Sequence, residues 1–160
     1  SVYRVDVARI AGDARKYTFT LRDDDFRADY TATVEAPDFT ITAPEPGVAL
    51  SRTATWDIAW EPPRPDAVIR VRVDDVVDGE TCLGAPVDIE VGDVGAAQVA
   101  PGQVEVSAAG LPAVDKCSAT LRLSRHAVAP LERVGGASHL HPDSSVFAAT
   151  SREIPFLSVP

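Results

Sequence analysis

Apolar and polar residues alternate with a period of two along most of the chain. Tyr17, Phe19 and Leu21, for example, are separated by threonines. Successive side chains of a β-strand point to opposite faces, so strict alternation predicts half-buried strands. On this basis we expect nine strands, whose apolar positions lie within residues 3–7, 17–21, 30–34, 39–41, 56–60, 69–73, 87–91, 104–106 and 121–123.

Turn-forming residues separate these segments. Gly, Pro and Asp recur at intervals of roughly 8–12 residues, a spacing typical of an antiparallel sandwich or barrel. The first three runs predict a β-meander. We expect one domain over residues 1–160, with a sub-boundary near Pro37 as the alternative, which would divide a meander (1–36) from a core (37–160). The one segment considered for a helix runs from Asp143 toward Glu153, but its Ser and Thr content disfavours a helix.

Length and charge narrow the class of protein. A chain of 160 residues with 45% hydrophobic residues can bury a core of its own. Its 15 basic and 24 acidic residues leave a net charge of −9, which disfavours nucleic acid and anionic lipid as partners. No apolar run reaches the ~20 residues of a membrane span. The chain starts at Ser1 and contains no Met, so we expect a mature or trimmed chain whose export signal is absent.

The two cysteines, Cys82 and Cys117, predict a disulfide. Cys117 starts an inward-facing alternation, and Cys82 lies in a turn-rich stretch. A bridge between them would contribute about 4 kcal/mol in the chain-entropy model. An acidic, proline-rich, strand-rich chain is typical of an oxidising compartment. The alternative is two separate buried thiols.

Three stretches resemble the opening of immunoglobulin-like and fibronectin type III-like modules from bacterial secreted proteins and surface lipoproteins. In such modules a proline-bounded first strand precedes a strand that carries a core tryptophan, here Trp60. The resemblance implies an antiparallel β-sandwich that serves as a spacer, adhesin or binding unit. The chain differs from antibody domains in that neither Trp56 nor Trp60 lies between the two cysteines. The stretches are 37–44, 47–52 and 56–63, and the closing segments 122–125 and 152–156 are also similar.

Two groups of residues are candidate metal ligands. His139 and His141 share one face of a strand, and imidazole with carboxylate suits zinc; Asp143 and His126 would complete that set. Acidic turns suit calcium, which takes six to eight oxygen ligands. The alternative in each case is solvated surface residues, with aspartate favoured by turn geometry. The acidic turns contain Asp23, Asp24 and Asp25, and Asp74, Asp75, Asp78 and Glu80.

No catalytic motif accompanies these residues. The sequence has no Gly-x-Ser-x-Gly elbow, no phosphate-binding loop and no dinucleotide fingerprint. Trp56 and Trp60 would stack on sugars if they were exposed, but their alternation favours the core. Candidate binding loops are 23–27, 62–66, 74–84 and 134–144, and Trp56, Arg64 and Asp24 are the candidate binding residues.

These observations predict a non-catalytic module, secreted or held in the cell envelope, that acts as a spacer or binds a protein or glycan. A lipid anchor upstream of the chain fits this expectation. We expect no obligatory cofactor. The alternative is a module stabilised by calcium or zinc, and a hydrolase is the third choice.

Overall fold

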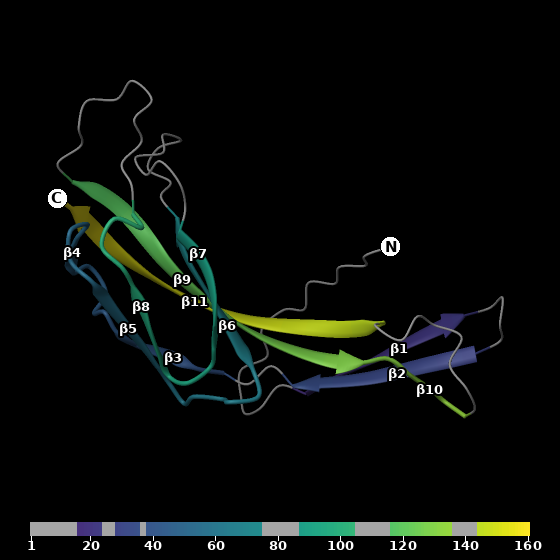
Figure 1. Ribbon diagram of the computed structural model, residues 1–160. Helices are drawn as coiled ribbons and strands as arrows, with labels where there is room; N and C mark the ends of the chain where they lie inside the picture. Colours follow the sequence, from purple (N-terminus) through teal and green to yellow (C-terminus); the bar gives the residue numbers. More distant parts are fainter. Residues whose placement is uncertain (1–15, 24–27, 36–37, 75–86, 105–115, 136–143) are drawn as a thin grey trace, which may run out of the picture.

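The structure is a computed structural model that describes residues 16–23, 28–35, 38–74, 87–104, 116–135 and 144–160. Every regular element in these ranges is a β-strand, so the described part of the protein is all-β (Figure 1). The strands are β1 (Lys16–Asp23), β2 (Ala28–Glu35), β3 (Thr40–Ala43), β4 (Ala49–Ser51), β5 (Trp56–Glu61), β6 (Val68–Asp74), β7 (Val87–Gly92), β8 (Ala96–Val99), β9 (Cys117–Pro130), β10 (Glu132–Arg133) and β11 (Ser145–Val159).

The described strands form three sheets. The largest has five strands in the order β4-β11-β9-β6-β7, and the other two have the orders β3-β5-β8 and β1-β2-β10. Neighbouring strands are antiparallel in every described pair except β4 and β11, which run parallel. The first two described strands, β1 and β2, pair antiparallel, as the alternation in that part of the sequence predicts.

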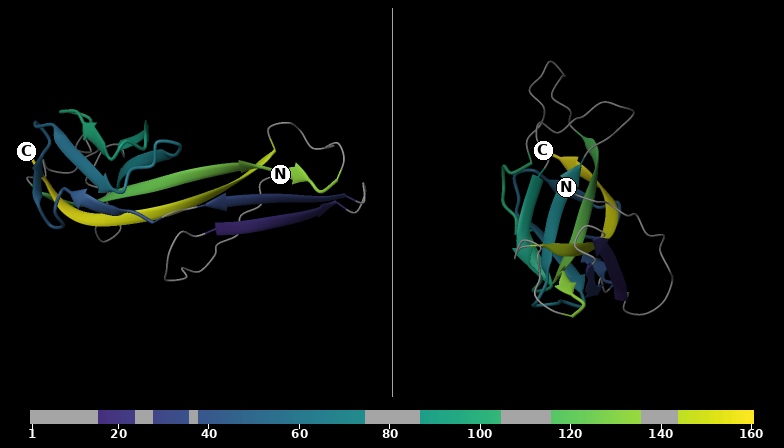
Figure 2. Two further views of the ribbon diagram at one scale, coloured as in Figure 1. Left: turned by 90° about the horizontal axis from the view of Figure 1, so that it is seen from below. Right: turned by 90° about the vertical axis from the view of Figure 1, so that its right-hand side faces the viewer.

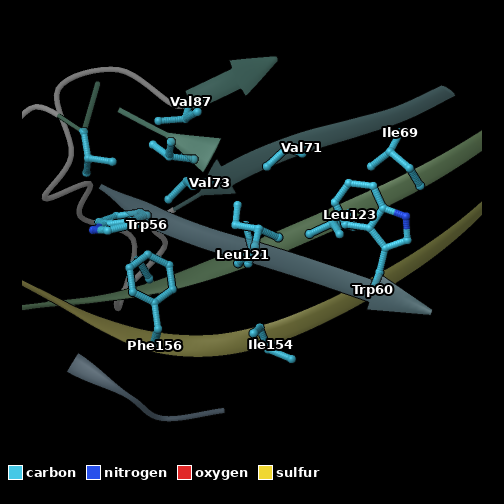
Figure 3. Packing of buried hydrophobic residues seen from close by; sticks show 14 of the residues in the cluster. Trp56, Trp60, Ile69, Val71, Val73, Val87, Leu121, Leu123, Ile154 and Phe156 are labelled. Carbon is cyan, nitrogen blue, oxygen red and sulfur yellow. The ribbon is translucent and has the colours of Figure 1, made fainter. Parts of the chain in front are cut away.

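One hydrophobic core joins β3-β5-β8 to the five-stranded sheet. Trp56 and Trp60 project from β5 toward the apolar residues of β6 and β9 (Figure 3), and Ile58 of β5 belongs to the same buried cluster. The rings of Trp56 and Phe156 meet edge to face, with centroids 5.1 Å apart. We call this part of the molecule, built by β3 to β8 and the facing parts of β9 and β11, the core end.

The two longest strands continue beyond the core end. β9 and β11 pair from Cys117 and Ser158 to Pro130 and Ser145, so they carry one unbroken hairpin into a second region (Figures 1 and 2). There β2 contacts both strands and buries its own apolar face, Ala28, Tyr30, Ala32 and Val34. We call this region the arm; it comprises β1, β2, β10 and residues 127–130 and 145–149.

Most strands expected from alternation are confirmed. The segment considered for a helix is not helical in its described part, as its Ser and Thr content predicts, because from Ser145 onward it belongs to β11 and pairs with β9. The strand expected at 104–106 is wrong at its first residue. Val104 is buried in the core but lies in a bend after β8, not in a strand. The run at 3–7 lies outside the described residues. The single-domain organisation and the alternative boundary near Pro37 remain predictions.

Candidate functional site

A buried ion pair lies where the core end meets the arm. Arg125 of β9 donates from Nε to Oδ2 of Asp93 at 2.5 Å, and the two side chains are 1% and 0% exposed. Trp60 donates its indole N–H to the other carboxylate oxygen of Asp93, also at 2.5 Å. Asp93 lies in the connection between β7 and β8, so the pair links three separate segments.

The rest of the guanidinium is also satisfied by hydrogen bonds. Arg125 donates from Nη1 to the Asp38 carbonyl at 3.2 Å and from Nη2 to the Pro62 carbonyl at 2.6 Å. Its Cζ lies 4.8 Å from the centre of the Phe39 ring. Taking two charges out of water costs several kcal/mol per ion, so such a pair is tolerated only when its remaining donors and acceptors find partners. Here they do, and the pair holds the loops of the core end against β9.

A second arginine reinforces the same corner from β11. Arg152 forms an ion pair with Asp38 and donates from Nε to the Phe39 carbonyl at 3.2 Å. Its Cζ lies 6.0 Å from the centre of the Phe39 ring, so this aromatic ring is close to two cations. The two residues just before β3 are thereby attached to both long strands.

A groove with a cavity volume of about 360 Å³ opens beside this junction. Volumes of roughly 300–1,000 Å³ are usual for ligand pockets. Its walls come from the ends of β1 and β2, the turn before β6, and the part of β9 that belongs to the arm. The lining residues are Lys16, Thr33, Val34, Glu35, Arg64, Asp66, Ala67, Ala127 and Val128.

The lining of the groove combines charged residues of both signs with a few small apolar residues. Arg64 is half-buried and pairs with Asp66 at 3.0 Å and with Glu35 at 3.5 Å. Lys16 is exposed. The turn before β6 is held by backbone hydrogen bonds to the buried acid: Arg64 donates its N–H to the Asp93 carbonyl, and Asp93 donates its own to the Ala67 carbonyl. The groove is therefore anchored to the buried ion pair.

The candidate binding residues lie in different environments in the structure. Trp56 is wrong as a binding-surface residue, because it is 4% exposed and donates its indole N–H to the Ser51 carbonyl at 2.7 Å. Trp60 is in the core, as the alternation predicts. Arg64 lines the groove. Asp24 lies outside the described residues.

Of the candidate metal ligands, Asp23 at the end of β1, Asp74 and His126 lie in the described part of the chain. The Asp74 carboxylate pairs with Arg72 at 2.7 Å and lies 3.9 Å from Arg122, so its charge is already balanced by arginines. No three His, Cys, Asp or Glu residues within the described ranges gather closely enough to hold a metal ion. The other candidates lie outside those ranges: Asp24, Asp25, Asp75, Asp78, Glu80, His139, His141 and Asp143.

Cys117 points into the core and is 3% exposed, as expected for the first residue of the inward face of β9. Cys82 lies outside the described residues. The disulfide between them therefore remains a prediction.

The outer face of the core end carries ion pairs at the surface. Arg70 of β6 and Asp88 of β7 are diagonal neighbours, because the register pairs Arg70 with Glu90 and Arg72 with Asp88. The Arg70 guanidinium makes two hydrogen bonds to the Asp88 carboxylate, at 2.6 and 2.5 Å. These hydrogen bonds lower the pKa of Asp88; burial opposes the shift, and the positive charges of Arg70 and Arg72 add to the lowering. The pair is a structural feature of an exposed sheet face.

Sequence reasoning missed the most strongly buried charges of the junction. A signal for Arg125 existed, because the alternation Cys117, Ala119, Leu121, Leu123 places residue 125 on the core face of the strand. A charged residue in that position needs a buried partner. Nothing in the local sequence around Asp93 indicates that it is this partner.

The comparisons with known proteins add no relative. No family model, no curated protein and no solved structure matches the chain. Within its described residues the chain has no helix long and apolar enough to cross a membrane.

Proposed function

We propose that this chain is a non-catalytic module, secreted or held in the cell envelope, that acts as a spacer and presents a binding surface for a protein or glycan. The observation that supports this most directly is the unbroken β9–β11 hairpin. At about 3.3 Å per residue, the 15 residues of β11 cover roughly 50 Å and belong to both the core end and the arm. A hairpin shared by two packed regions resists bending between them, which suits a spacer.

An immunoglobulin-like sandwich is the finer assignment that we propose for the core end. In the letters used for immunoglobulin strands, β3-β5-β8 corresponds to A-B-E and β11-β9-β6-β7 to G-F-C-C′, in the chain order of that fold. The pairs β5–β8 and β6–β9 then match the B–E and C–F neighbours of such a sandwich. The arm has no counterpart in this scheme and would be an addition to the module.

The secreted or envelope location, with a lipid anchor upstream, is part of the proposal. Its support is the predicted disulfide and the acidic, proline-rich composition. Thermal melts with and without reductant test the first of these. A loss of stability on reduction that a Cys82→Ser variant reproduces would support it, and identical melting temperatures would contradict it.

The function is tested by binding and turnover measured on the same preparation. The purified chain is immobilised and screened against purified envelope proteins and defined glycans, and in parallel it is incubated with a panel of esters, glycosides and peptides. We expect saturable binding to at least one partner and no turnover. Turnover that scales with protein concentration and survives repurification would overturn the proposal.

The same preparation also discriminates the metal-stabilised alternative. Melting temperatures are compared in EDTA, calcium and zinc, since a ligand that binds only the folded state raises stability by mass action. Because the Asp74 carboxylate is already paired with Arg72, we expect it to contribute no metal-dependent change in melting temperature. Asp74→Asn should therefore respond to the three conditions as the parent chain does.

A further inference from the structure

Two short strand edges border the groove. The ladder between β9 and β6 ends at the pair His126–Val68, so residues 127–130 have β11 on one side and no described strand on the other. On β2, the neighbour opposite β1 is β10, which pairs with Tyr30 and Thr31 and leaves residues 32–35 with no described strand on that side. Residues from both edges, Thr33 to Glu35 and Ala127 with Val128, line the groove.

Strand edges of this kind favour an extended peptide chain as the occupant of the groove. The backbone N–H and C=O groups of an open edge are a template for another extended chain, and β-strand addition is a recurrent mode of peptide recognition. A helix or a compact ligand offers no regular row of backbone donors and acceptors. The volume of about 360 Å³ falls in the range of ligand pockets, so the groove admits a short segment and not a whole domain.

The walls determine the side chains that such a segment would carry. Val34, Ala67 and Ala127 leave room for small apolar side chains pointing inward. At the rim, Arg64 is already held by Glu35 and Asp66, whereas Lys16 is exposed. An acidic side chain near Lys16 complements the rim better than a basic one.

From these observations we propose that the groove between β2 and β9 binds an extended peptide segment of a partner protein, in which small apolar residues alternate with polar ones and an acidic residue faces Lys16. The segment adds as a strand beside residues 127–130 of β9, in line with β6. The inference rests on the proposed function, because it names the class of partner that a binding module of this shape would take.

The test uses the whole chain and a defined probe. A set of eight-residue, end-capped peptides alternates Ala, Val or Thr with Asp, and a matched set replaces Asp with Lys. Binding is followed by backbone amide shifts, and amide hydrogen exchange is measured with and without saturating peptide. We expect the Asp set to bind and to slow exchange at amides within 32–35 and 127–130.

Two variants and a matched control sharpen the result. Ala127→Trp fills the groove and should weaken binding at least tenfold. Lys16→Glu keeps the groove open and should reduce affinity for the Asp set by about two- to fivefold, the size of an exposed ion pair. Lys116→Glu makes the same charge change at an exposed position outside the groove and should leave affinity unchanged.

Several outcomes would overturn the inference. They are no binding by either set, protection confined to other strands, or equal effects of the Lys16 and Lys116 changes. Protection of these edges by a second copy of the chain, seen as a dimer in sedimentation, would also replace the peptide with self-association. Binding to a partner elsewhere on the chain would leave the proposed function standing, whereas enzymatic turnover would remove it.

Discussion

The core end and the arm share two strands but are built differently. At the core end, large side chains such as Trp56, Trp60 and Leu123 fill the space between two sheets, and a buried ion pair closes the side next to the arm. In the arm, the same inward face of β9 and β11 continues with alanine and valine, and Tyr30 is the one large fully buried residue among those described. The core end therefore buries more apolar surface per residue, and we expect it to carry most of the stability.

The outer face of the core end is more polar than the outer face of the arm. The outer face of the core end is polar, with Arg122 paired to Glu153 and Ser124 hydrogen-bonded to Ser151. In the arm, Val128 and Phe147 are direct cross-strand partners and are 67% and 64% exposed. Along the β9–β11 hairpin, the inward face therefore changes from large apolar residues at the core end to small residues in the arm. Its outward face changes from polar to apolar over the same distance. The difference indicates that the core end is built for stability, whereas the arm leaves surface open.

The largest effect is expected at the junction. Arg125→Met leaves the Asp93 carboxylate buried without its cation, which should lower the free energy of unfolding by about 3–5 kcal/mol. The double variant Arg125→Met, Asp93→Asn removes both charges and should recover at least half of that loss. Urea unfolding of the parent, the single and the double variant gives the comparison. A single variant as stable as the parent would mean that the pair does not hold the two regions together.

The cores themselves can be compared by truncating one residue in each. Leu123→Ala at the core end should cost about 2–5 kcal/mol because it leaves a cavity among large neighbours. Ala148→Gly in the arm, on the same face of the sheet, should cost about 0.5–1 kcal/mol, mainly through backbone entropy. Chemical denaturation measures both. Equal costs would contradict the expectation that the arm buries less apolar surface than the core end.

Local stability should follow the same order. Amide hydrogen exchange at low denaturant should show opening of β1 and β2 at a free energy at least about 1.4 kcal/mol below that of β5, β6 and the first half of β9, because fewer apolar contacts hold the arm. Uniform exchange across both regions would show that the arm and the core end open together.

The exposed pair in the arm should be nearly neutral for stability. Phe147→Thr should change the free energy of unfolding by no more than about 0.5 kcal/mol, since its ring is already in water, and should reduce binding of a hydrophobic dye. Phe156→Ala, on the same strand but in the core, is the control and should cost about 3–5 kcal/mol. A large loss from the Phe147 change would mean that the ring is covered in solution.

The smallest effect concerns the outer face of the core end. Hydrogen bonds from Arg70 lower the pKa of Asp88, so this carboxylate stabilises the fold above its unfolded pKa of about 3.9 and loses that contribution as the pH falls through the lower folded value. Arg70→Ala should therefore lose less stability between pH 6 and pH 2 than the parent. Urea midpoints across that range measure it, and identical acid slopes would rule out the pair as a contributor.

Much of this organisation follows from alternation alone. The spacing of Tyr17 to Leu21, of Trp56 to Trp60 and of Ile69 to Val73 predicts strands that the structure contains, and it predicts that Trp60 is buried. Alternation failed where tertiary pairing decided the outcome. In the segment from Ser145 onward, adjacent apolar residues such as Val146-Phe147 and Phe156-Leu157 obscure the period of two, yet it is a strand because β9 supplies a partner from Ser145 to Ser158.

The sequence by itself determined the all-β class, the inward face of β9 from Cys117 and the burial of Trp60, because these depend on local periodicity. Only the tertiary structure brought Asp93 to Arg125, 32 positions apart in the chain, and placed the edges of β2 and β9 on one groove. Contacts between residues far apart in the sequence depend on which strands become neighbours in a sheet. That choice is made by the summed burial and hydrogen bonding of the whole fold, which no short stretch of sequence encodes.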